Sequence, residues 1–196
     1  MKDINIGLAW FDAMRTVLDN GLPKDDELIE LLNYQGNWKP TPELDPLIEA
    51  FANIKYIEEM EKVFFSRHEN MFNHSYYDRV VGPYGNSGTK DIVKLLRDKT
   101  STKKALLTFV PEGNGKVPCI NIIHFLILQN RLHVHYFARG QDIFNKFYAD
   151  AYCIQKYGEL VAKELSIPIE ACVGTISSAH IYLEDVERVR SILTKI

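Results

Sequence analysis

The sequence predicts an α+β protein in which helices flank a sheet that contains a β-hairpin. Two observations indicate this fold class. Hydrophobic residues recur at helical spacing near both ends of the chain, and strand-like hydrophobic runs fill much of the stretch between residues 105 and 139. Helices and strands that are segregated along the chain are typical of α+β folds, whereas a regular β–α–β alternation is typical of parallel α/β sheets.

Length and composition set the outer limits. We expect the 196 residues to form a single domain, 1–196. A net charge of −3 gives no reason to expect a nucleic-acid partner. The longest apolar run, 120–128, is too short to cross a membrane, and the N-terminal residues do not resemble a signal peptide. Three cysteines at these spacings indicate neither disulfides nor a zinc site, so we expect a reduced, cytoplasmic protein without a metal.

Individual elements follow from periodicity and from turn-forming residues. In the N-terminal half these features predict helices over residues 6–18, 25–32, 41–51 (opened by Thr41-Pro42), 56–68 and 89–97. In the C-terminal half they predict a strand at 105–110, an exposed turn at 111–117, paired strands at 120–128 and 132–139, a helix at 147–165, a strand at 171–176 and a helix at 185–193. The turn of the hairpin contains Asn130, which suits a positive φ.

Cys119 is the first candidate for chemistry. It follows Pro118 at the start of one hairpin strand, and the partner strand ends at Arg139, so the hairpin would bring the guanidinium back toward the sulfur. A neighbouring guanidinium favours the thiolate, which is the reactive form. Taken alone, a cysteine next to a strand end is more often structural than catalytic, as a small buried hydrophobe.

Four further side chains are candidates. His180 and Tyr182 are two residues apart, so in an extended chain both rings face the same side; the alternative is a rim histidine beside a core tyrosine. Asp142 and Asp150 flank the start of the helix that follows Arg139. Asp142 also suits a helix N-terminal charge, and Asp150 also suits a solvated surface acid.

Taken in order, these residues resemble the thymidylate synthase superfamily. In that family a Pro-Cys nucleophile precedes a hairpin, an Arg-Ser-x-Asp segment, a substrate-reading asparagine and a later His-x-Tyr. The corresponding stretches here are Pro118-Cys119, Arg139-Gly140-Gln141-Asp142, Asp150 and His180-Ile181-Tyr182. The order and the spacing both agree. The resemblance implies a twisted mixed sheet flanked by helices and a two-fold homodimer.

The resemblance extends outward in three segments. Glu61-Lys62-Val63-Phe64-Phe65 is similar to the family's Glu-Leu-x-Trp-Phe and implies that Glu61 is the catalytic glutamate. The segment 82–85, with Tyr84, is similar to its Gly-Pro-x-Tyr-Gly loop. Lys103-Lys104 stands where the family has an arginine pair that reaches the partner subunit's phosphate site. Residues 33–56 do not match, and the family's N-terminal arginine loop has no counterpart.

The resemblance also implies a reaction. The Cys119 thiolate would add to C6 of a pyrimidine nucleotide, and C5 would take a one-carbon unit from 5,10-methylenetetrahydrofolate. The roles implied for the other residues are as follows: Glu61 organises proton transfers, Arg139 binds the phosphate and the thiolate, Asp142 meets the folate ring, and His180 and Tyr182 bind the sugar. Tyr84, Lys103 and Lys104 complete the expected substrate-binding set.

Departures from the family pattern indicate a cytosine nucleotide. Asp150 stands where the synthases have the asparagine that reads uracil, and cytidylate hydroxymethylases resemble this chain at that position. A carboxylate accepts hydrogen bonds and therefore suits the N4 amino group of cytosine. The sequence ends soon after Tyr182 without the family's closing segment, which favours capture of water, and thus a hydroxymethyl product, over hydride transfer.

Three alternatives stay open at this point. One is a divergent thymidylate synthase that methylates dUMP. Another is a homologue that binds nucleotide without turnover, because Gly140 and Lys103-Lys104 replace the family's phosphate-binding serine and arginines. The last is an unrelated hydrolase using Cys119 and His180, against which stands the lack of an evident oxyanion loop.

Overall fold

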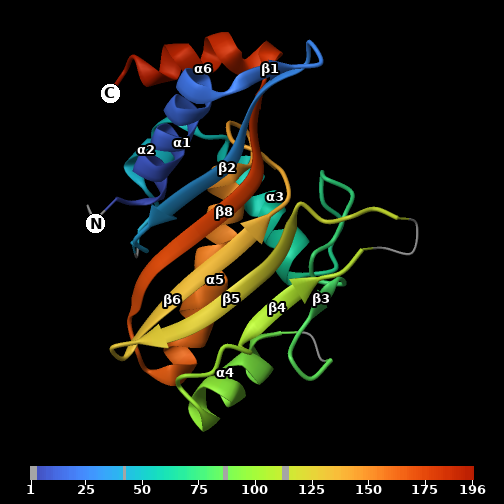
Figure 1. The fold of residues 1–196 in the computed structure, drawn as a ribbon, viewed down its shortest axis with the longest axis vertical. Helices are drawn as coiled ribbons and strands as arrows, with labels where there is room; N and C mark the ends of the chain where they lie inside the picture. Colours follow the sequence, from blue (N-terminus) through green and yellow to red (C-terminus); the bar gives the residue numbers. More distant parts are fainter. Residues whose placement is uncertain (1–3, 42, 86–87, 112–114) are drawn as a thin grey trace.

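The computed structural model describes residues 4–41, 43–85, 88–111 and 115–196. An eight-stranded mixed sheet runs through the molecule in the order β1-β2-β8-β6-β5-β4-β3, with β7 pairing onto β8 (Figure 1). The strands are β1 (Leu22–Lys24), β2 (Leu28–Trp38), β3 (Val80–Val81), β4 (Leu106–Phe109), β5 (Ile120–Leu128), β6 (Arg131–Ala138), β7 (Gln141–Asp142) and β8 (Ile169–Tyr182). The mixed sheet and its flanking helices confirm the predicted fold class.

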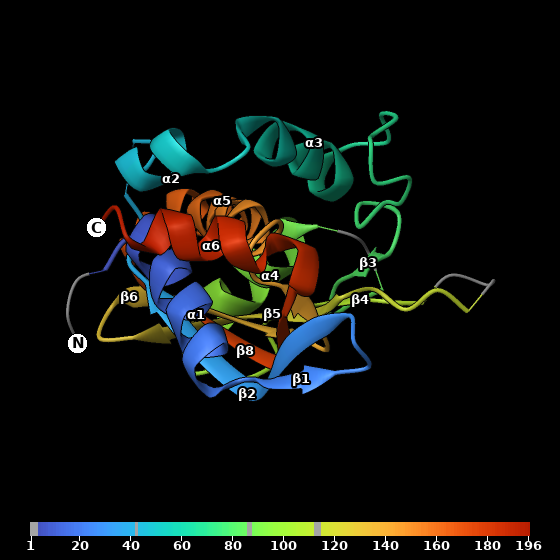
Figure 2. The same ribbon diagram turned by 90° about the horizontal axis from the view of Figure 1, so that it is seen from above.

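Helices lie on one side of this sheet, as Figure 2 shows. They are α1 (Ile6–Asn20), α2 (Pro46–Phe51), α3 (Ile54–Phe65), α4 (Thr89–Asp98), α5 (Phe147–Leu165) and α6 (Val186–Leu193), with a 3₁₀ turn at Leu183–Asp185. The long helix α5 packs on β6 and β8, and α3 and α4 pack on α5 in turn. Among the helices of the described residues, none is long and apolar enough to cross a membrane.

The β5–β6 hairpin forms as predicted. Gln129 and Asn130 both adopt positive φ, 52° and 57°, which is the geometry of a tight two-residue hairpin turn. The paired register then carries Ile120 opposite Ala138 at the far end. The helix predicted at 147–165 is α5 with the same bounds, and it ends at Ser166 in the left-handed region.

The N-terminal prediction is wrong at residues 25–32, which form no helix. Asp25 and Asp26 have positive φ and turn the chain from β1 into β2. β2 then pairs with β8 along most of its length, and Tyr34, Gly36 and Trp38 alternate inward. Leucine-rich residues with good helix propensity become a strand here because pairing with a central strand outweighs local preference.

Two further boundaries differ from the prediction. Pro42 of the expected Thr41-Pro42 cap lies outside the described residues, and α2 begins only at Pro46, capped by Asp45, whose carboxylate accepts from the backbone N–H of Leu47. The strand predicted at 171–176 is much longer and includes His180 and Tyr182. Parts of the predicted turns at 82–88 and 111–117 also lie outside the described residues.

The uncovered face of the sheet is partly hydrophobic. Side chains of β5 and β6 alternate, so Val134 and Tyr136 face α5 while His135 and Phe137 face away. Phe137 is 37% exposed and lies opposite Ile122, which is 36% exposed. Within the described part of the chain, no helix covers these residues.

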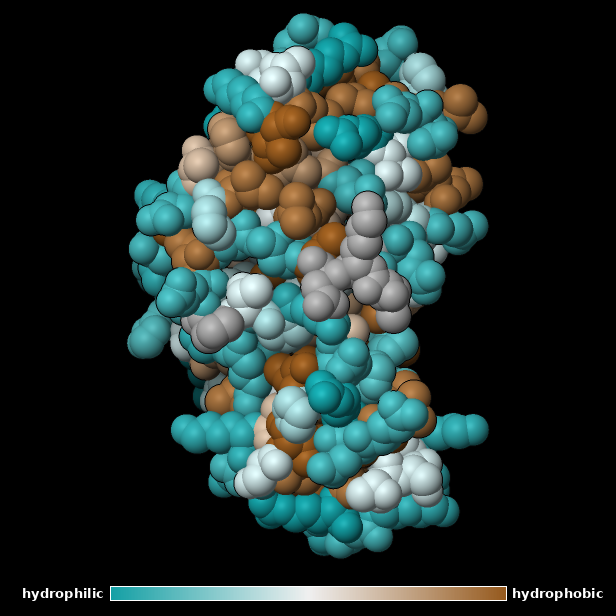
Figure 3. Space-filling view, turned by 90° about the vertical axis from the view of Figure 1, so that its left-hand side faces the viewer, coloured by the Kyte–Doolittle hydropathy of each residue, from teal (hydrophilic) through white to brown (hydrophobic). Residues whose placement is uncertain are grey.

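Another side of the molecule also exposes apolar groups. Figure 3 shows hydrophobic side chains gathered in the upper half of this view. A groove lined by Ile4, Leu8, Phe11 and Ile196 lies where the start of α1 meets the end of the chain. Cys119, at the start of β5, does not line this groove.

Candidate functional site

Cys119 and Arg139 meet at the open end of the β5–β6 hairpin. The backbone N–H of Arg139 donates to the Cys119 carbonyl oxygen at 2.9 Å. The Arg139 guanidinium donates to the carbonyl oxygens of Pro118 and Val117, at 3.1 and 3.0 Å, and its Nη2 lies 3.9 Å from the Cys119 sulfur. The side chain of Cys119 is exposed, whereas Cys153 and Cys172 are buried. Of the three thiols, Cys119 is thus the one that a substrate can reach.

The thiol of Cys119 is held protonated in the free protein. Partial burial of the sulfur raises the pKa of Cys119, and the charge of Asp150 raises it further. Arg139 and Lys146 lower the pKa, so the expected effect of the guanidinium is present but is outweighed. The thiolate therefore forms only when the pKa of Cys119 falls, for example when a ligand neutralises Asp150, or when a base takes the proton.

His180, Tyr182 and Asp142 lie on the adjoining edge. β7 pairs in parallel with β8, which sets Asp142 opposite His180, and the rings of His180 and Tyr182 meet edge to face at 5.4 Å between centroids. The Asp142 carboxylate accepts from the backbone and side-chain N–H groups of Asn145 at 3.0 and 3.1 Å. Burial raises the pKa of Asp142, and the bonds from Asn145 oppose that rise. The charge of Asp142 also raises the pKa of Tyr182, after burial.

Asp150 is buried, so its interpretation as a solvated surface acid is wrong. It lies in the first turn of α5 and is 4% exposed. Gln141 Nε2 donates to its Oδ2 at 2.9 Å, and the hydroxyl of Tyr136 donates to Gln141 Oε1 at 2.9 Å. The other oxygen, Oδ1, is buried and accepts no hydrogen bond from the described residues. Burial is the main cause that raises the pKa of Asp150 to about 7.

An unpartnered buried oxygen of this kind needs an explanation, because leaving it unbonded costs about 1–3 kcal/mol. Asp150 acts electrostatically on Cys119, so the two groups belong to one site. A ligand that bonds Oδ1 while its ring lies against Cys119 would remove the cost.

Lys146, Gln141 and Tyr136 belong to this site but were not identified from the sequence. Lys146 begins α5, and its charge lowers the pKa of both Cys119 and Asp150. One signal was available for it, since Lys146 is four residues before Asp150 at the start of the predicted helix, a spacing that places two side chains on one helical face. Gln141 and Tyr136 gave no such signal, because their contacts depend on how β6, β7 and α5 pack.

Glu61 lies on α3, which packs against α5. Its carboxylate accepts from Lys156 Nζ at 2.6 Å. Burial raises the pKa of Cys153, and the charges of Asp150 and Glu61 each raise it further, so both carboxylates lie near this thiol. Its neighbour Glu59 instead binds Lys62 and the backbone N–H of Met71.

Lys103, Lys104 and Tyr84 are not brought to Cys119 within one chain. The lysines are exposed and precede β4, where the Ala105 carbonyl oxygen accepts from Phe125. Phe125 is six residues along β5 from Cys119, which is roughly 20 Å in an extended strand. Tyr84 is 53% exposed, and Lys94 of α4 lies over its ring.

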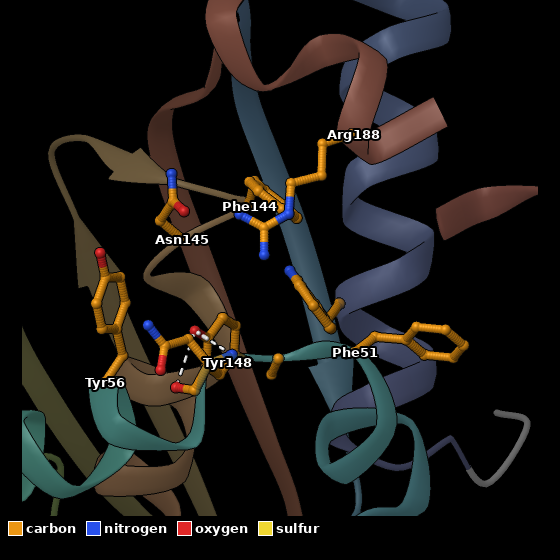
Figure 4. A pocket seen from close by; sticks show the side chains of 9 residues that line it. Phe51, Tyr56, Phe144, Asn145, Tyr148 and Arg188 are labelled. Carbon is orange, nitrogen blue, oxygen red and sulfur yellow. Dashed lines mark hydrogen bonds between the residues drawn. The ribbon is translucent and has the colours of Figure 1, made fainter. Parts of the chain in front are cut away.

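A small cavity lies beside Asn145, the residue that bonds Asp142 (Figure 4). It holds about 50 Å³ and is lined by Trp10, Phe51, Ala52, Asn53, Tyr56, Phe144, Asn145, Tyr148 and Arg188. The Arg188 guanidinium lies over the Phe144 ring at 5.1 Å, and Tyr148 bonds the backbone of Asn53. Asn145 connects this cavity to the site, because its side-chain amide donates to Asp142 at 3.1 Å; the same amide also donates to Asp185 at 2.8 Å. The volume suits a few water molecules.

Comparisons with known proteins agree with this geometry. A sequence model of the family described as thymidylate synthase matches residues 87–196, more than half of the chain and all of the hairpin, β7, α5 and β8. This chain belongs to the thymidylate synthase family.

Two curated relatives of the family are similar over most of the chain. Both carry the name "Putative thymidylate synthase". One, from Methanocaldococcus jannaschii, is 27% identical over 170 residues, covering 80% of this chain and 73% of the relative. The other, from Methanosarcina mazei, is 26% identical over 203 residues, covering 96% of this chain and 92% of the relative.

The fold is shared with a solved member of the family. Thermostable thymidylate synthase A from Bacillus subtilis matches with a TM-score of 0.71 at 11% sequence identity, covering 97% of this chain and 84% of that chain. The family fold therefore extends over nearly all of this chain, including residues 33–56, where the motif comparison found no correspondence.

The buried Asp150 predicts a pH dependence of stability. Because its pKa rises from 3.8 to about 7, the folded state keeps a proton that the unfolded chain releases above about pH 4. Folding stability then falls as the pH rises from 4 to 7, by at most about 4 kcal/mol, and the loss is complete above 7. Asp150→Asn removes this titration. The free energy of unfolding of the variant minus that of the wild type, measured in urea, should therefore be larger at pH 8 than at pH 5. A difference that does not change with pH would contradict the assignment.

Proposed function

We propose that this protein is a pyrimidine nucleotide C5 one-carbon transferase, and specifically a 5-hydroxymethylase of CMP or dCMP that uses 5,10-methylenetetrahydrofolate. The observation that carries the proposal is the buried Asp150. Its Oδ1 accepts no hydrogen bond from the described residues, and its charge raises the pKa of the exposed Cys119 thiol. Membership of the thymidylate synthase family supports the reaction class.

Cys119 is the nucleophile of the proposed reaction. Its sulfur adds to C6 of the pyrimidine, which makes C5 nucleophilic, and C5 takes the one-carbon unit from methylenetetrahydrofolate. Loss of the C5 proton and of tetrahydrofolate would leave an exocyclic methylene group; water would add to it, and the sulfur would leave C6 to give the hydroxymethyl product. Arg139 stands beside the sulfur and lowers the thiol pKa, so it favours the attacking form. Glu61 is proposed to organise the proton transfers; it lies on α3, and its carboxylate pairs with Lys156 of α5.

Asp150 is proposed to read the base. Cytosine carries an amino donor at position 4 and an acceptor at N3. A carboxyl group supplies the matching acceptor and, when protonated, the matching donor. The pKa near 7 keeps the protonated form available at neutral pH. The synthases' asparagine would suit uracil, whose groups at positions 3 and 4 are reversed.

Asp142 fits the proposed cofactor. The pterin ring of a folate presents adjacent N–H donors, which a carboxylate accepts side by side. Both oxygens of Asp142 are held in place by Asn145 and keep further lone pairs. The folate supplies the carbon at the oxidation level of formaldehyde. The residues of this chain orient it and, by burial around Asp142, limit the access of water.

The remaining predicted residues are assigned to the sugar and phosphate. His180 and Tyr182 extend from the end of β8 toward Asp142 and are proposed to bind the sugar hydroxyl. Arg139 would bind the phosphate from its own chain. Lys103 and Lys104 are roughly 20 Å along the sheet from Cys119 and would act in the partner's site, with Tyr84 as an outer contact.

Methylation of dUMP is the second candidate. It is favoured by the relatives from Methanocaldococcus jannaschii and Methanosarcina mazei, both of which carry the name "Putative thymidylate synthase". Asp150 argues against it, because an ionised carboxylate would oppose the O4 of uracil.

A homodimer is also proposed. The sheet face with Ile122, His135 and Phe137 is partly apolar and is covered by none of the helices that the structure describes, and a two-fold contact between two such faces would bury it. The same contact would carry the lysines of one chain toward Arg139 of the other.

Replacement of the nucleophile tests the reaction. Cys119→Ser should reduce exchange of the C5 hydrogen into solvent by roughly 10³-fold or more, since exchange requires the covalent adduct at C6. Nucleotide binding, measured by calorimetry, should persist. Cys172→Ser is the matched control, because its thiol is buried away from the hairpin end and its loss should affect stability alone. Full exchange in the Cys119 variant would refute the mechanism.

Base selection has its own test. Asp150→Asn should lower turnover of the cytosine nucleotide and raise that of the uracil nucleotide. Because a mismatched buried pair costs about 1–3 kcal/mol, the ratio should change by roughly tenfold to a hundredfold. The assay incubates the protein with methylenetetrahydrofolate and CMP, dCMP, UMP or dUMP and identifies products by mass spectrometry. An unchanged ratio would remove Asp150 from the role of base reader.

Assembly can be checked with a surface charge. Phe137→Lys places an ammonium in the uncovered face and should convert the wild-type dimer to a monomer in analytical ultracentrifugation, because an unpaired charge cannot be buried there. Leu160→Lys is the control; this leucine is 43% exposed on α5, on the opposite side of the sheet. A monomeric wild type would contradict the proposed assembly.

A further inference from the structure

A chain of two hydrogen bonds runs beneath the proposed base-reading residue. The Tyr136 hydroxyl donates to Gln141 Oε1, and Gln141 Nε2 donates to Asp150 Oδ2, each at 2.9 Å. All three side chains are buried, at 3%, 3% and 4% exposure. They come from β6, β7 and α5, so three elements converge on one carboxyl group.

The direction of this chain is fixed at Tyr136. A methyl group at Gly174 of β8 would overlap the Tyr136 ring, so the ring fills the space that the glycine leaves. The Trp38 ring meets it at 6.2 Å between centroids. Burial raises the pKa of Tyr136 well above its usual value, and the charge of Asp150 adds to this effect, so the hydroxyl stays neutral and remains a donor. With the Gln141 oxygen held by this donor, its NH₂ group points to Asp150.

The two oxygens of Asp150 are therefore not equivalent. Oδ2 receives an N–H and acts as an acceptor. A proton on Oδ2 would turn the oxygen that accepts from Gln141 into a hydroxyl, which is a weaker acceptor than a carbonyl oxygen, whereas Oδ1 accepts no bond from the described residues and is open to a proton. The neutral acid thus has a single favoured form, with its hydrogen on Oδ1.

We propose that Gln141 is a specificity-determining positioning residue, which keeps the carboxyl proton on Oδ1 and so presents an acceptor and a donor to the base in one fixed order. This inference rests on the proposed function, in which Asp150 contacts the pyrimidine. Gln141 itself touches only Asp150 and Tyr136 through its amide and acts on the base through the carboxyl group.

The order matters because a neutral carboxylic acid matches either base. Cytosine requires an acceptor opposite its N4 amino group and a donor opposite N3. Uracil requires the reverse, a donor opposite O4 and an acceptor opposite N3–H. Moving the proton from one oxygen to the other exchanges the two patterns. A free aspartic acid would bind both bases, and one with a fixed proton discriminates between them.

Gln141→Leu removes the donated N–H and should let the proton occupy either oxygen. The ratio of CMP to UMP affinity, measured by calorimetry without cofactor, should then fall about tenfold, the loss of one matched polar contact. The pKa of Asp150, followed by ¹³C NMR, should rise, because the bond from Gln141 stabilises the ionised form. Tyr136→Phe should shift both readouts in the same direction by less, and it carries the test if the leucine variant fails to fold.

Gln155→Leu is the matched control. Like Gln141, Gln155 is buried, but it lies on α5 and its amide donates to Thr41 and Glu159 instead of Asp150. Its variant should keep the wild-type ratio. Gln141→Glu is the conservative comparison: only its protonated form can donate, so discrimination should return as the pH falls.

The outcomes separate the two proposals. If Asp150→Asn changes the CMP-to-UMP ratio but folded Gln141→Leu and Tyr136→Phe do not, the role of Gln141 is refuted and the base-reading role stands. If Asp150→Asn leaves the ratio unchanged, both proposals are refuted.

Discussion

The site depends on the backbone bond from the N–H of Arg139 to the carbonyl oxygen of Cys119, which closes the β5–β6 hairpin at the end opposite its turn. This bond places the guanidinium and the sulfur on the same edge. The neighbouring parallel pairing of β6 with β8 brings β7 and the His180 end of β8 alongside. A shift of either register by one residue would turn these side chains to the other face of the sheet. The register therefore determines which side chains lie together at this edge.

Burial of Asp150 is the second constraint, and it works against stability. A buried carboxyl group either stays protonated or lowers the stability of the fold when it ionises. The single hydrogen bond from Gln141 only partly replaces the bonds to water that Asp150 loses. The surrounding core is large enough to hold it, with α5 packed on the sheet and aromatic rings around Tyr136 and Tyr76. Stability given up at one buried polar group is a common mark of a binding site, because a ligand can restore the missing contact.

The same carboxyl group connects base recognition to the nucleophile. Its charge raises the pKa of Cys119 while Arg139 and Lys146 lower it. Neutralisation of Asp150 on binding a base would therefore shift the balance toward the thiolate. Under the proposed function, the reactive form of Cys119 would be favoured when the nucleotide is in place, and the exposed thiol would stay protonated in its absence.

The sequence by itself determined the elements whose signals are local. The hairpin followed from alternating apolar residues around Asn130, α5 from its helical period, and the Cys119–Arg139 pair from the hairpin that joins them. Motif spacing was sufficient for the family and for the list of candidate residues.

The tertiary structure decided what depends on long-range pairing. Residues 28–32 joined β8 as a strand against their helix propensity, because a central pairing partner outweighs local preference. Asp150, which local reasoning left between surface acid and base reader, is buried since α5 packs its first turn against β7, and Gln141, Tyr136 and Lys146 gained their places only when distant segments came together.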